Sequence, residues 1–268
     1  MEKNYRQTFD RLWKHYINLC PSALKIHNLL QEKDKLVNDH IAFRTFDDPR
    51  VNSSVLASHF EELGYSVKGN YHFEEKKLNA IHLEHPEPLA PKVFISELIT
   101  TEFSGSLQSI LKKVVDEIPE KWQGNKDTIF QGRLWSLPSY DIYEHLRKES
   151  EYAAWLYVYG FCANHFTVYV NYLNSFQGLA DLNRFLVEHG FAMNTSGGII
   201  KGDPTVYLEQ SSILADNIIL DFQEGSYEIP GCYYEFAYRY EKGDSIFNGF
   251  VTQSADKIFE STNKKSSK

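Results

Sequence analysis

One pattern occurs twice in this chain. The segment Asp39-His40-Ile41-Ala42-Phe43-Arg44 begins a run that ends at Gly64-Tyr65, and Asn164-His165-Phe166-Thr167-Val168-Tyr169 begins a run that ends at Gly190-Phe191. The first histidine lies 24 residues before its glycine, and the second lies 25 residues before its own. A repeated spacing of this kind indicates one structural module used twice, so the two histidines should occupy equivalent positions. Two equivalent imidazoles at strand starts could form a metal site between the modules.

The composition is that of an ordinary globular protein. The 268 residues are 42% hydrophobic and 15% aromatic, which is enough for a buried core, and we expect a single domain over residues 1–268. A formal net charge of −8 argues against a nucleic-acid partner, because that binding depends on clustered Lys and Arg. The chain starts without an apolar signal region, and its longest apolar run, near residues 155–163, is shorter than the roughly 18 residues of a membrane span. We therefore expect a cytoplasmic protein with no membrane partner.

The three cysteines suit neither a disulfide framework nor a zinc ribbon. Cys20, Cys162 and Cys232 are widely spaced along the chain. Cys162 lies three residues before His165, and Cys232 lies three before Glu235, so in a strand each thiol would face away from its neighbour. We interpret all three as buried thiols in a reducing compartment.

Hydrophobic periodicity divides the chain into four regions. These are an N-terminal helical segment (1–37), module one (38–100), a helical linker (101–160) and module two (161–260). Module one should hold a strand over 40–46, a helix over 53–63 and short strands near 66–67, 80–84 and 92–98. Module two should hold a strand over 165–171, a helix over 176–189 and strands near 199–201, 205–209, 218–222 and 233–240. The linker should hold helices over 107–118 and 139–159.

The pattern predicts an α+β fold in which two βαβββ-type modules form an open, curved, barrel-like sheet around a metal site. Additional helices should cover the outside of this sheet. On the last strand of each module lies a glutamate among apolar neighbours, Glu97 in the first and Glu235 in the second. We expect both to point inward with His40 and His165, because a buried carboxylate is costly without a partner and a divalent cation is a suitable one.

Three interpretations of this site remain open from the residues alone. Two histidines and one carboxylate form the facial triad of non-heme Fe(II) oxygenases. A four-ligand set that includes Glu97 would instead suit Zn, Ni or Mn in a hydrolase, isomerase or lyase that works without O2. The third is a non-catalytic binding module whose cavity is filled by side chains such as Tyr169 or Phe46.

Three segments resemble the 2-oxoadipate dioxygenase/decarboxylase family, which was long known only as a domain of unknown function. The likeness covers nearly the whole chain, and the segments are Asn38-Asp39-His40-Ile41-Ala42-Phe43-Arg44-Thr45-Phe46, Val93-Phe94-Ile95-Ser96-Glu97-Leu98 and Tyr233-Tyr234-Glu235-Phe236-Ala237-Tyr238-Arg239. The resemblance implies a core like the vicinal-oxygen-chelate fold, with Fe(II) held by His40, His165 and Glu235. It leaves Glu97 as a fourth ligand or as a neighbour that orients a histidine. Zn, Ni or Mn could replace iron in crystals.

The resemblance also implies the reaction. A 2-oxo dicarboxylic acid such as 2-oxoadipate would react with O2 to give 2-hydroxyglutarate and CO2 in lysine degradation, and these small molecules would be the partners. Arg44 would bind a substrate carboxylate, and Ser254, Arg239 and Tyr169 are further candidates for the substrate cavity. The loop between Glu235 and the closing residues 250–256 is short compared with better-characterised bacterial members, which leaves the natural substrate open.

Overall fold

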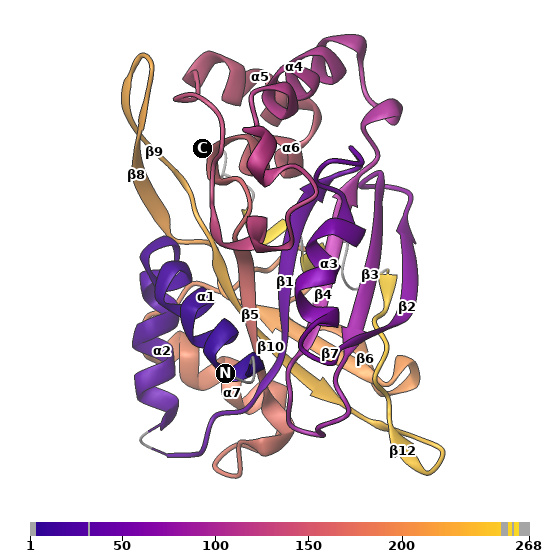
Figure 1. Cartoon of the computed structure of the whole chain (residues 1–268). Helices are drawn as coiled ribbons and strands as arrows, with labels where there is room; N and C mark the ends of the chain where they lie inside the picture. Colours follow the sequence, from indigo (N-terminus) through magenta and orange to yellow (C-terminus); the bar gives the residue numbers. More distant parts are fainter. Residues whose placement is uncertain (1–3, 32, 253–256, 259, 263–268) are drawn as a thin grey trace.

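A curved eight-stranded sheet forms the centre of the protein in a computed structural model that describes residues 4–31, 33–252, 257–258 and 260–262 (Figure 1). The strand order is β2-β3-β4-β1-β5-β10-β7-β6. The α+β class and the open, curved sheet predicted from the repeat are thus confirmed. The strands of this sheet are β1 (Asn38–Phe46), β2 (Ser66–Phe73), β3 (Leu78–Glu84), β4 (Lys92–Leu98), β5 (Ala163–Tyr169), β6 (Lys201–Asp203), β7 (Leu208–Ser212) and β10 (Tyr233–Arg239).

The duplication is visible in the order of the strands. The first half of the sheet reads β2-β3-β4-β1, and the second half reads β5-β10-β7-β6, which is the same arrangement in reverse. The strand β1 is parallel to β4, β5 is parallel to β10, and β1 and β5 pair antiparallel where the halves meet. In that central pair Ala42 lies opposite His165, and His40 lies opposite Thr167. Both histidines therefore lie on one face of the sheet, close to the junction.

The helices α1 (Tyr5–Leu19) and α3 (Ser53–Glu61) pack on the opposite, outer face of the sheet. The Phe43 ring on β1 lies 5.5 Å from the Phe60 ring of α3, and the Phe166 ring on β5 lies 4.9 Å from the Tyr16 ring of α1. Among the described residues, no helix has both the length and the apolar character needed to cross a membrane. The helices are α1 (Tyr5–Leu19), α2 (Pro21–Gln31), α3 (Ser53–Glu61), α4 (Gly105–Asp116), α5 (Tyr140–Glu149), α6 (Glu151–Tyr159) and α7 (Leu179–Glu188), with 3₁₀ turns at Thr100–Glu102, Glu120–Trp122, Lys126–Phe130, Val170–Tyr172, Pro204–Val206 and Glu260–Thr262.

Two predicted elements differ from the structure for local reasons. The helix expected over 139–159 is divided at Ser150, whose extended backbone ends α5 and whose side chain accepts a hydrogen bond from the Ala153 amide to begin α6. The strand expected near 218–222 exists as β8 (Asn217–Phe222), but it pairs with β9 (Gly225–Pro230) in a hairpin separate from the main sheet. A further short hairpin, β11 (Glu241–Lys242) and β12 (Ser245–Ile246), follows β10.

Candidate metal centre

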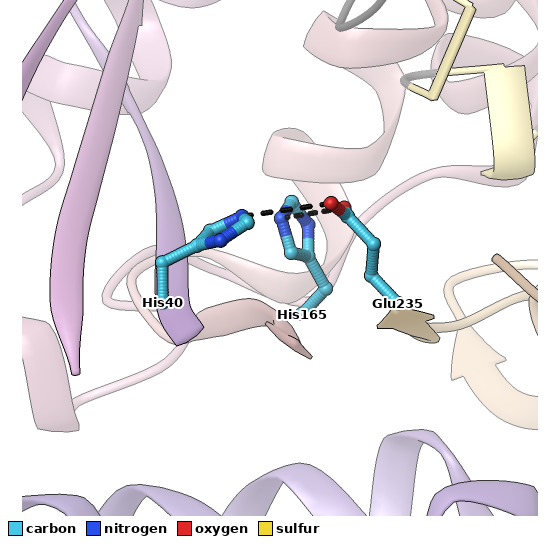
Figure 2. Close-up of side chains that lie close together, drawn as sticks. All are labelled: His40, His165 and Glu235. Carbon is cyan, nitrogen blue, oxygen red and sulfur yellow. Dashed lines mark ion pairs between the residues drawn. The ribbon is translucent and has the colours of Figure 1, made fainter. Parts of the chain in front are cut away.

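The side chains of His40, His165 and Glu235 converge on the inner face of the sheet (Figure 2). They come from β1, β5 and β10, three neighbouring strands at the junction of the halves. One ligand-capable atom from each lies within 4.8 Å of the others. Glu235 Oε2 lies 3.3 Å from His165 Nε2, and Glu235 Oε1 lies 3.7 Å from His40 Nε2. Two histidines from separate modules and one carboxylate therefore meet at one point.

A β-bulge beside each histidine turns a polar neighbour toward its ring. The pairing of β1 with β5 skips Asp39 on one strand and Asn164 on the other. Asp39 Oδ1 accepts a hydrogen bond from His40 Nδ1 at 2.7 Å, and Asn164 Oδ1 accepts one from His165 Nδ1 at 3.0 Å. Because each Nδ1 is the protonated donor, each Nε2 is an unprotonated acceptor, and that of His40 lies 3.1 Å from the Thr167 hydroxyl oxygen. The sequence analysis missed this role, although the two doublets recur in the repeat.

The electrostatics of this group favour a cation. Burial lowers the pKa of His40, and burial followed by the charges of His40 and Arg44 holds the pKa of His165 well below its ordinary value. Burial raises the pKa of Glu235 to about 8. Glu235 Oε1 accepts a hydrogen bond from Gln210 Nε2 at 2.6 Å, whereas Oε2 has no hydrogen-bond partner among the described residues. Two neutral imidazoles and a buried carboxylate oxygen without a donor are a ligand set that fits a divalent metal ion.

The stability of the metal-free protein should depend on pH through Glu235. Since the pKa of this carboxyl is about 8 in the folded state and near 4.5 otherwise, its contribution to stability is complete below about pH 4.5 and is lost as the pH rises toward 8. We expect the free energy of unfolding of wild type, relative to Glu235→Gln, to fall by a few kcal/mol between about pH 5 and pH 9. Urea unfolding in excess chelator measures this difference. A difference that does not change with pH would contradict the assignment.

Arg239 connects Asp39 to the segment after β10. Its Nε and Nη2 donate to the Asp39 carboxylate at 2.5 and 2.8 Å, and its Nη1 donates to the carbonyls of Phe247 and Gly249 at 3.0 and 2.8 Å. Burial alone would raise the pKa of Asp39, but the charges of Arg239 and Lys92 hold it well below its ordinary value. Arg239, which the sequence analysis placed in the substrate cavity, thus has most of its donors bound within the protein.

Asp39→Asn is expected to weaken metal binding by about 10- to 100-fold, because Asp39 orients a ligand histidine. It should also lower the free energy of unfolding by about 3–5 kcal/mol, since buried Arg239 loses its counter-charge. Asn164→Leu is the matched control, because it removes the acceptor of His165 Nδ1 without breaking an ion pair and should cost about 1–3 kcal/mol. Metal titration and urea unfolding of both variants separate these effects. Equal losses of stability would argue against the ion-pair explanation.

Apolar side chains, together with Gln210, line a small cavity beside the three candidate ligand atoms. Phe94, Phe250 and Ile258 line the same cavity, which has a volume of about 20 Å³. The Phe250 ring lies 4.9 Å from the His40 ring and 4.8 Å from the Phe94 ring. A space of this size holds one ion or one water molecule. The aromatic rings therefore separate the ligand atoms from bulk water.

Glu97 lies on the outer face of the sheet, so the prediction that it points inward is wrong. In the parallel pair of β1 and β4, His40 lies opposite Lys92 and Thr45 lies opposite Glu97. Glu97 therefore shares the outer face with Thr45. Its Oε2 accepts a hydrogen bond from the Ser53 amide at 2.9 Å, where a carboxylate interacts favourably with the N-terminus of α3. This position leaves it outside the group formed by the two histidines and Glu235.

Arg44 lies on the inner face, four residues beyond His40 and about 13 Å along β1. Its side chain is buried, and its Cζ lies 4.9 Å from the Tyr152 ring centroid and 5.0 Å from the Trp155 ring centroid. Contact with these rings orients the guanidinium, which is suited to bidentate binding of a carboxylate. Arg44 also lines a cavity of about 240 Å³, with charged neighbours Glu75, Lys76, Lys77, Arg147, Glu149 and Glu151.

Tyr169 and Ser254 are the two other residues expected at the substrate cavity, and only Tyr169 is among the described residues. Tyr169 is half-buried at the end of β5, where Lys92 Nζ lies 5.9 Å from its ring centroid. It does not line the small cavity around the three ligand atoms, as far as the described residues define that cavity. Ser254 lies outside the described residues.

Comparisons with known proteins point to one family. A family model described as 2-oxoadipate dioxygenase/decarboxylase matches residues 5–244. The Arabidopsis thaliana protein named 2-oxoadipate dioxygenase/decarboxylase, chloroplastic, is 34% identical over 291 residues, covering 97% of this chain and 78% of that protein. Both matches extend over most of the chain, and the range matched by the family model spans the positions of His40, His165 and Glu235.

Two solved structures share the whole fold. The hydroxyglutarate synthase of Oryza sativa, crystallised in complex with 2-oxoadipate, is 32% identical with a TM-score of 0.89, covering 96% of this chain and 91% of that chain. A Shewanella frigidimarina protein, provisionally named a hydrolase, is 46% identical with a TM-score of 0.89, covering 94% of this chain and 99% of that chain. The similarity therefore extends well beyond the metal centre.

Proposed function

Because this chain belongs to the 2-oxoadipate dioxygenase/decarboxylase family, we propose that it converts a 2-oxo dicarboxylic acid such as 2-oxoadipate, with O2, into 2-hydroxyglutarate and CO2. The observation that carries the proposal is the convergence of His40, His165 and Glu235 on one buried point. The name of the rice neighbour, a hydroxyglutarate synthase in complex with 2-oxoadipate, supports this choice of substrate and product. The reaction balances with one O2 consumed for each CO2 released.

We propose Fe(II) as the metal ion of this site. Two imidazoles and one carboxylate are the ligand set of non-heme Fe(II) oxygenases, which leaves coordination positions open for a 2-oxo acid and O2. Iron held by His40, His165 and Glu235 would supply the redox chemistry and the Lewis acidity that the reaction needs. Asp39 and Asn164 would keep both Nε2 lone pairs directed at the ion through their hydrogen bonds to Nδ1.

Arg44 is the residue that we propose for the second carboxylate of the substrate. Arg44 shares the inner face of β1 with His40. A substrate bound near the histidine can therefore extend along the strand toward the guanidinium. The charges are complementary, because a divalent ion, Glu235 and Arg44 together leave two positive charges and a 2-oxo dicarboxylate carries two negative ones. Both histidines stay neutral in this arrangement, since burial lowers the pKa of each.

The aromatic wall of the small cavity would control access of water. Phe94 and Phe250 lie against the ligand atoms, and the space between them holds little more than an ion. A six-carbon diacid is larger than this space, so substrate binding requires these side chains to move. Once substrate has displaced water, the low-dielectric surroundings strengthen its interactions with Arg44.

The other two interpretations of the sequence have less support. A four-ligand site for Zn, Ni or Mn depended on Glu97, which instead binds the start of α3 on the outer face. For the non-catalytic binding module, the named side chains Tyr169 and Phe46 do not line the small cavity as the described residues define it, and Phe94 and Phe250 narrow it instead. The Phe46 ring instead lies 6.1 Å from the Trp135 ring.

Anaerobic reconstitution with Fe(II), followed by 2-oxoadipate and a known amount of O2, tests the proposal. We expect O2 uptake, CO2 release and 2-hydroxyglutarate formation in equal amounts, and no uptake by the Zn-loaded protein. Absence of turnover across a panel of 2-oxo mono- and dicarboxylic acids would overturn it. Turnover with Zn, Ni or Mn in the absence of O2 would instead support a hydrolase, isomerase or lyase.

We also propose that the reaction belongs to lysine degradation and takes place in a reducing compartment such as the cytoplasm. Cys20, Cys162 and Cys232 are all buried free thiols, as expected from their spacing. Thiols that remain unpaired are typical of reducing compartments. Labelled lysine fed to cells that carry or lack the protein would show whether 2-oxoadipate accumulates without it.

A further inference from the structure

The two halves of the sheet correspond residue by residue around the metal centre. In the first half, β1 is parallel to β4, and Ala42 lies opposite Phe94. In the second half, β5 is parallel to β10, and Thr167 lies opposite Glu235. Ala42 and Thr167 each lie two residues after the histidine of their own strand. Phe94 is therefore the internal counterpart of the carboxylate Glu235.

The next strand outward shows the same correspondence. Ala80 on β3 lies opposite Ser96 on β4, and Gln210 on β7 lies opposite Ala237 on β10. Ser96 lies two positions after Phe94, and Ala237 lies two positions after Glu235. Ala80 is therefore the counterpart of Gln210. Gln210 Nε2 donates the hydrogen bond that holds Glu235 Oε1 at 2.6 Å. The ligand and the donor that orients it thus both have apolar counterparts in the first half.

Phe94 faces the same cavity as the three ligand side chains. It is buried and lines that cavity together with His40, His165 and Glu235. Phe94 enters from β4 and Glu235 from β10, on opposite sides of the central pair of β1 and β5. A carboxylate in place of the Phe94 ring would therefore approach the ion from the side opposite Glu235.

We propose that Phe94 determines the reaction class of this centre, because it keeps the fourth ligand position of the duplicated sheet apolar and so limits the ion to three protein ligands. This inference rests on the proposed function, since open positions are what a 2-oxo acid and O2 need together. A fourth protein ligand would occupy one of those positions and leave a centre suited to Lewis-acid chemistry.

The double variant Phe94→Glu with Ala80→Gln completes the symmetric ligand set. Glutamate is smaller than phenylalanine and glutamine is larger than alanine, so the pair of changes roughly preserves the volume of the site. Phe94→Gln with Ala80→Gln is the matched control, because it has the same shape without the carboxylate. Co(II) is a suitable probe, since its visible absorption reports its coordination in the absence of O2 turnover.

We expect the Glu variant to bind Co(II) at least about tenfold more tightly than the Gln control and wild type, because even residues that only orient ligands change metal affinity by about 10- to 100-fold. X-ray absorption should show one additional protein oxygen on Co(II) in this variant. The Fe(II)-loaded Glu variant should take up no O2 in the presence of 2-oxoadipate.

A folded Glu variant that binds Co(II) no more tightly than the Gln control, with the coordination of wild type, would overturn the inference. A Glu variant that fails to fold with Co(II) present, while the Gln control folds, would also overturn it, since a carboxylate within reach of the ion would be stabilised by it. If neither double variant folds, the single variant Phe94→His takes their place. Tighter Co(II) binding than wild type with one additional protein ligand would support the inference, and unchanged binding and coordination would overturn it. Failure of wild type to turn over 2-oxoadipate would overturn the proposed function but leave this comparison of Co(II) binding intact.

Discussion

Glu235→Gln is expected to abolish turnover and to weaken metal binding by more than about 100-fold. Glu235 is the only one of the three converging residues that brings a negative charge to the ion, and removal of a ligand should exceed the 10- to 100-fold effect of residues that merely orient ligands. The metal-free variant should remain folded, because a neutral amide is less costly to bury than a carboxylate. Isothermal titration with Co(II) and O2 uptake with Fe(II) measure the two effects.

Glu97→Gln provides the matched control for this change. It makes the same chemical substitution on the adjacent half of the sheet, but the carboxylate there binds the Ser53 amide on the outer face. We expect metal affinity and turnover close to wild type, with a loss of about 0.3–1 kcal/mol in stability from the start of α3. If both variants lost metal to the same extent, the assignment of Glu235 rather than Glu97 as the ligand would be wrong.

Arg44→Met should lower kcat/KM for 2-oxoadipate by about 100- to 1,000-fold, mainly through KM. A buried guanidinium that binds a substrate carboxylate contributes a few kcal/mol, and methionine keeps an apolar contact with Tyr152 and Trp155 without the charge. Arg44→Lys should recover only part of the loss, because an ammonium cannot bind a carboxylate in bidentate fashion. Steady-state O2 uptake over a range of 2-oxoadipate concentrations measures these changes.

A second substrate separates recognition of the carboxylate from general damage to the site. 2-Oxohexanoate has the same carbon chain as 2-oxoadipate but lacks the distal carboxylate. Wild type should prefer 2-oxoadipate strongly, and Arg44→Met should lose most of this preference, whatever its absolute rate. A preference that persists unchanged in Arg44→Met would show that another residue binds the distal carboxylate.

The sheet and its two central histidines could be predicted from the sequence because the repeat preserves both residue type and spacing. Nearly equal distances from each histidine to its helix-ending glycine imply similar modules, and similar modules that pair through their first strands give the reversed strand order that the structure shows. His40 and His165 then approach one another without any information about long-range contacts. This part of the site is therefore encoded locally.

The face of Glu97 could not be predicted in the same way. The strand β4 is largely buried on both sides, so its hydrophobic pattern does not distinguish inward from outward positions. A shift of one residue in the assumed register moves every side chain to the other face. The inward set is Val93, Ile95 and Glu97 in the prediction, and it is Lys92, Phe94 and Ser96 in the structure.

The residues that orient the ligands depend on features that strand alternation cannot show. Strict alternation directs Asp39 and Asn164 away from their neighbouring histidines, and only the two bulges turn them back. The partner of Asp39, Arg239, lies 200 residues away along the chain. Only the three-dimensional fold reveals this buried ion pair, so the sequence alone leaves Arg239 as a candidate for the substrate cavity.

Anomalous diffraction at the iron edge, from crystals grown anaerobically with Fe(II), tests the metal centre most directly. We expect a single strong peak at about 2.1 Å from Nε2 of His40, Nε2 of His165 and a carboxylate oxygen of Glu235. Iron bound to other residues, or no iron at this point in protein that is saturated with Fe(II), would contradict the account.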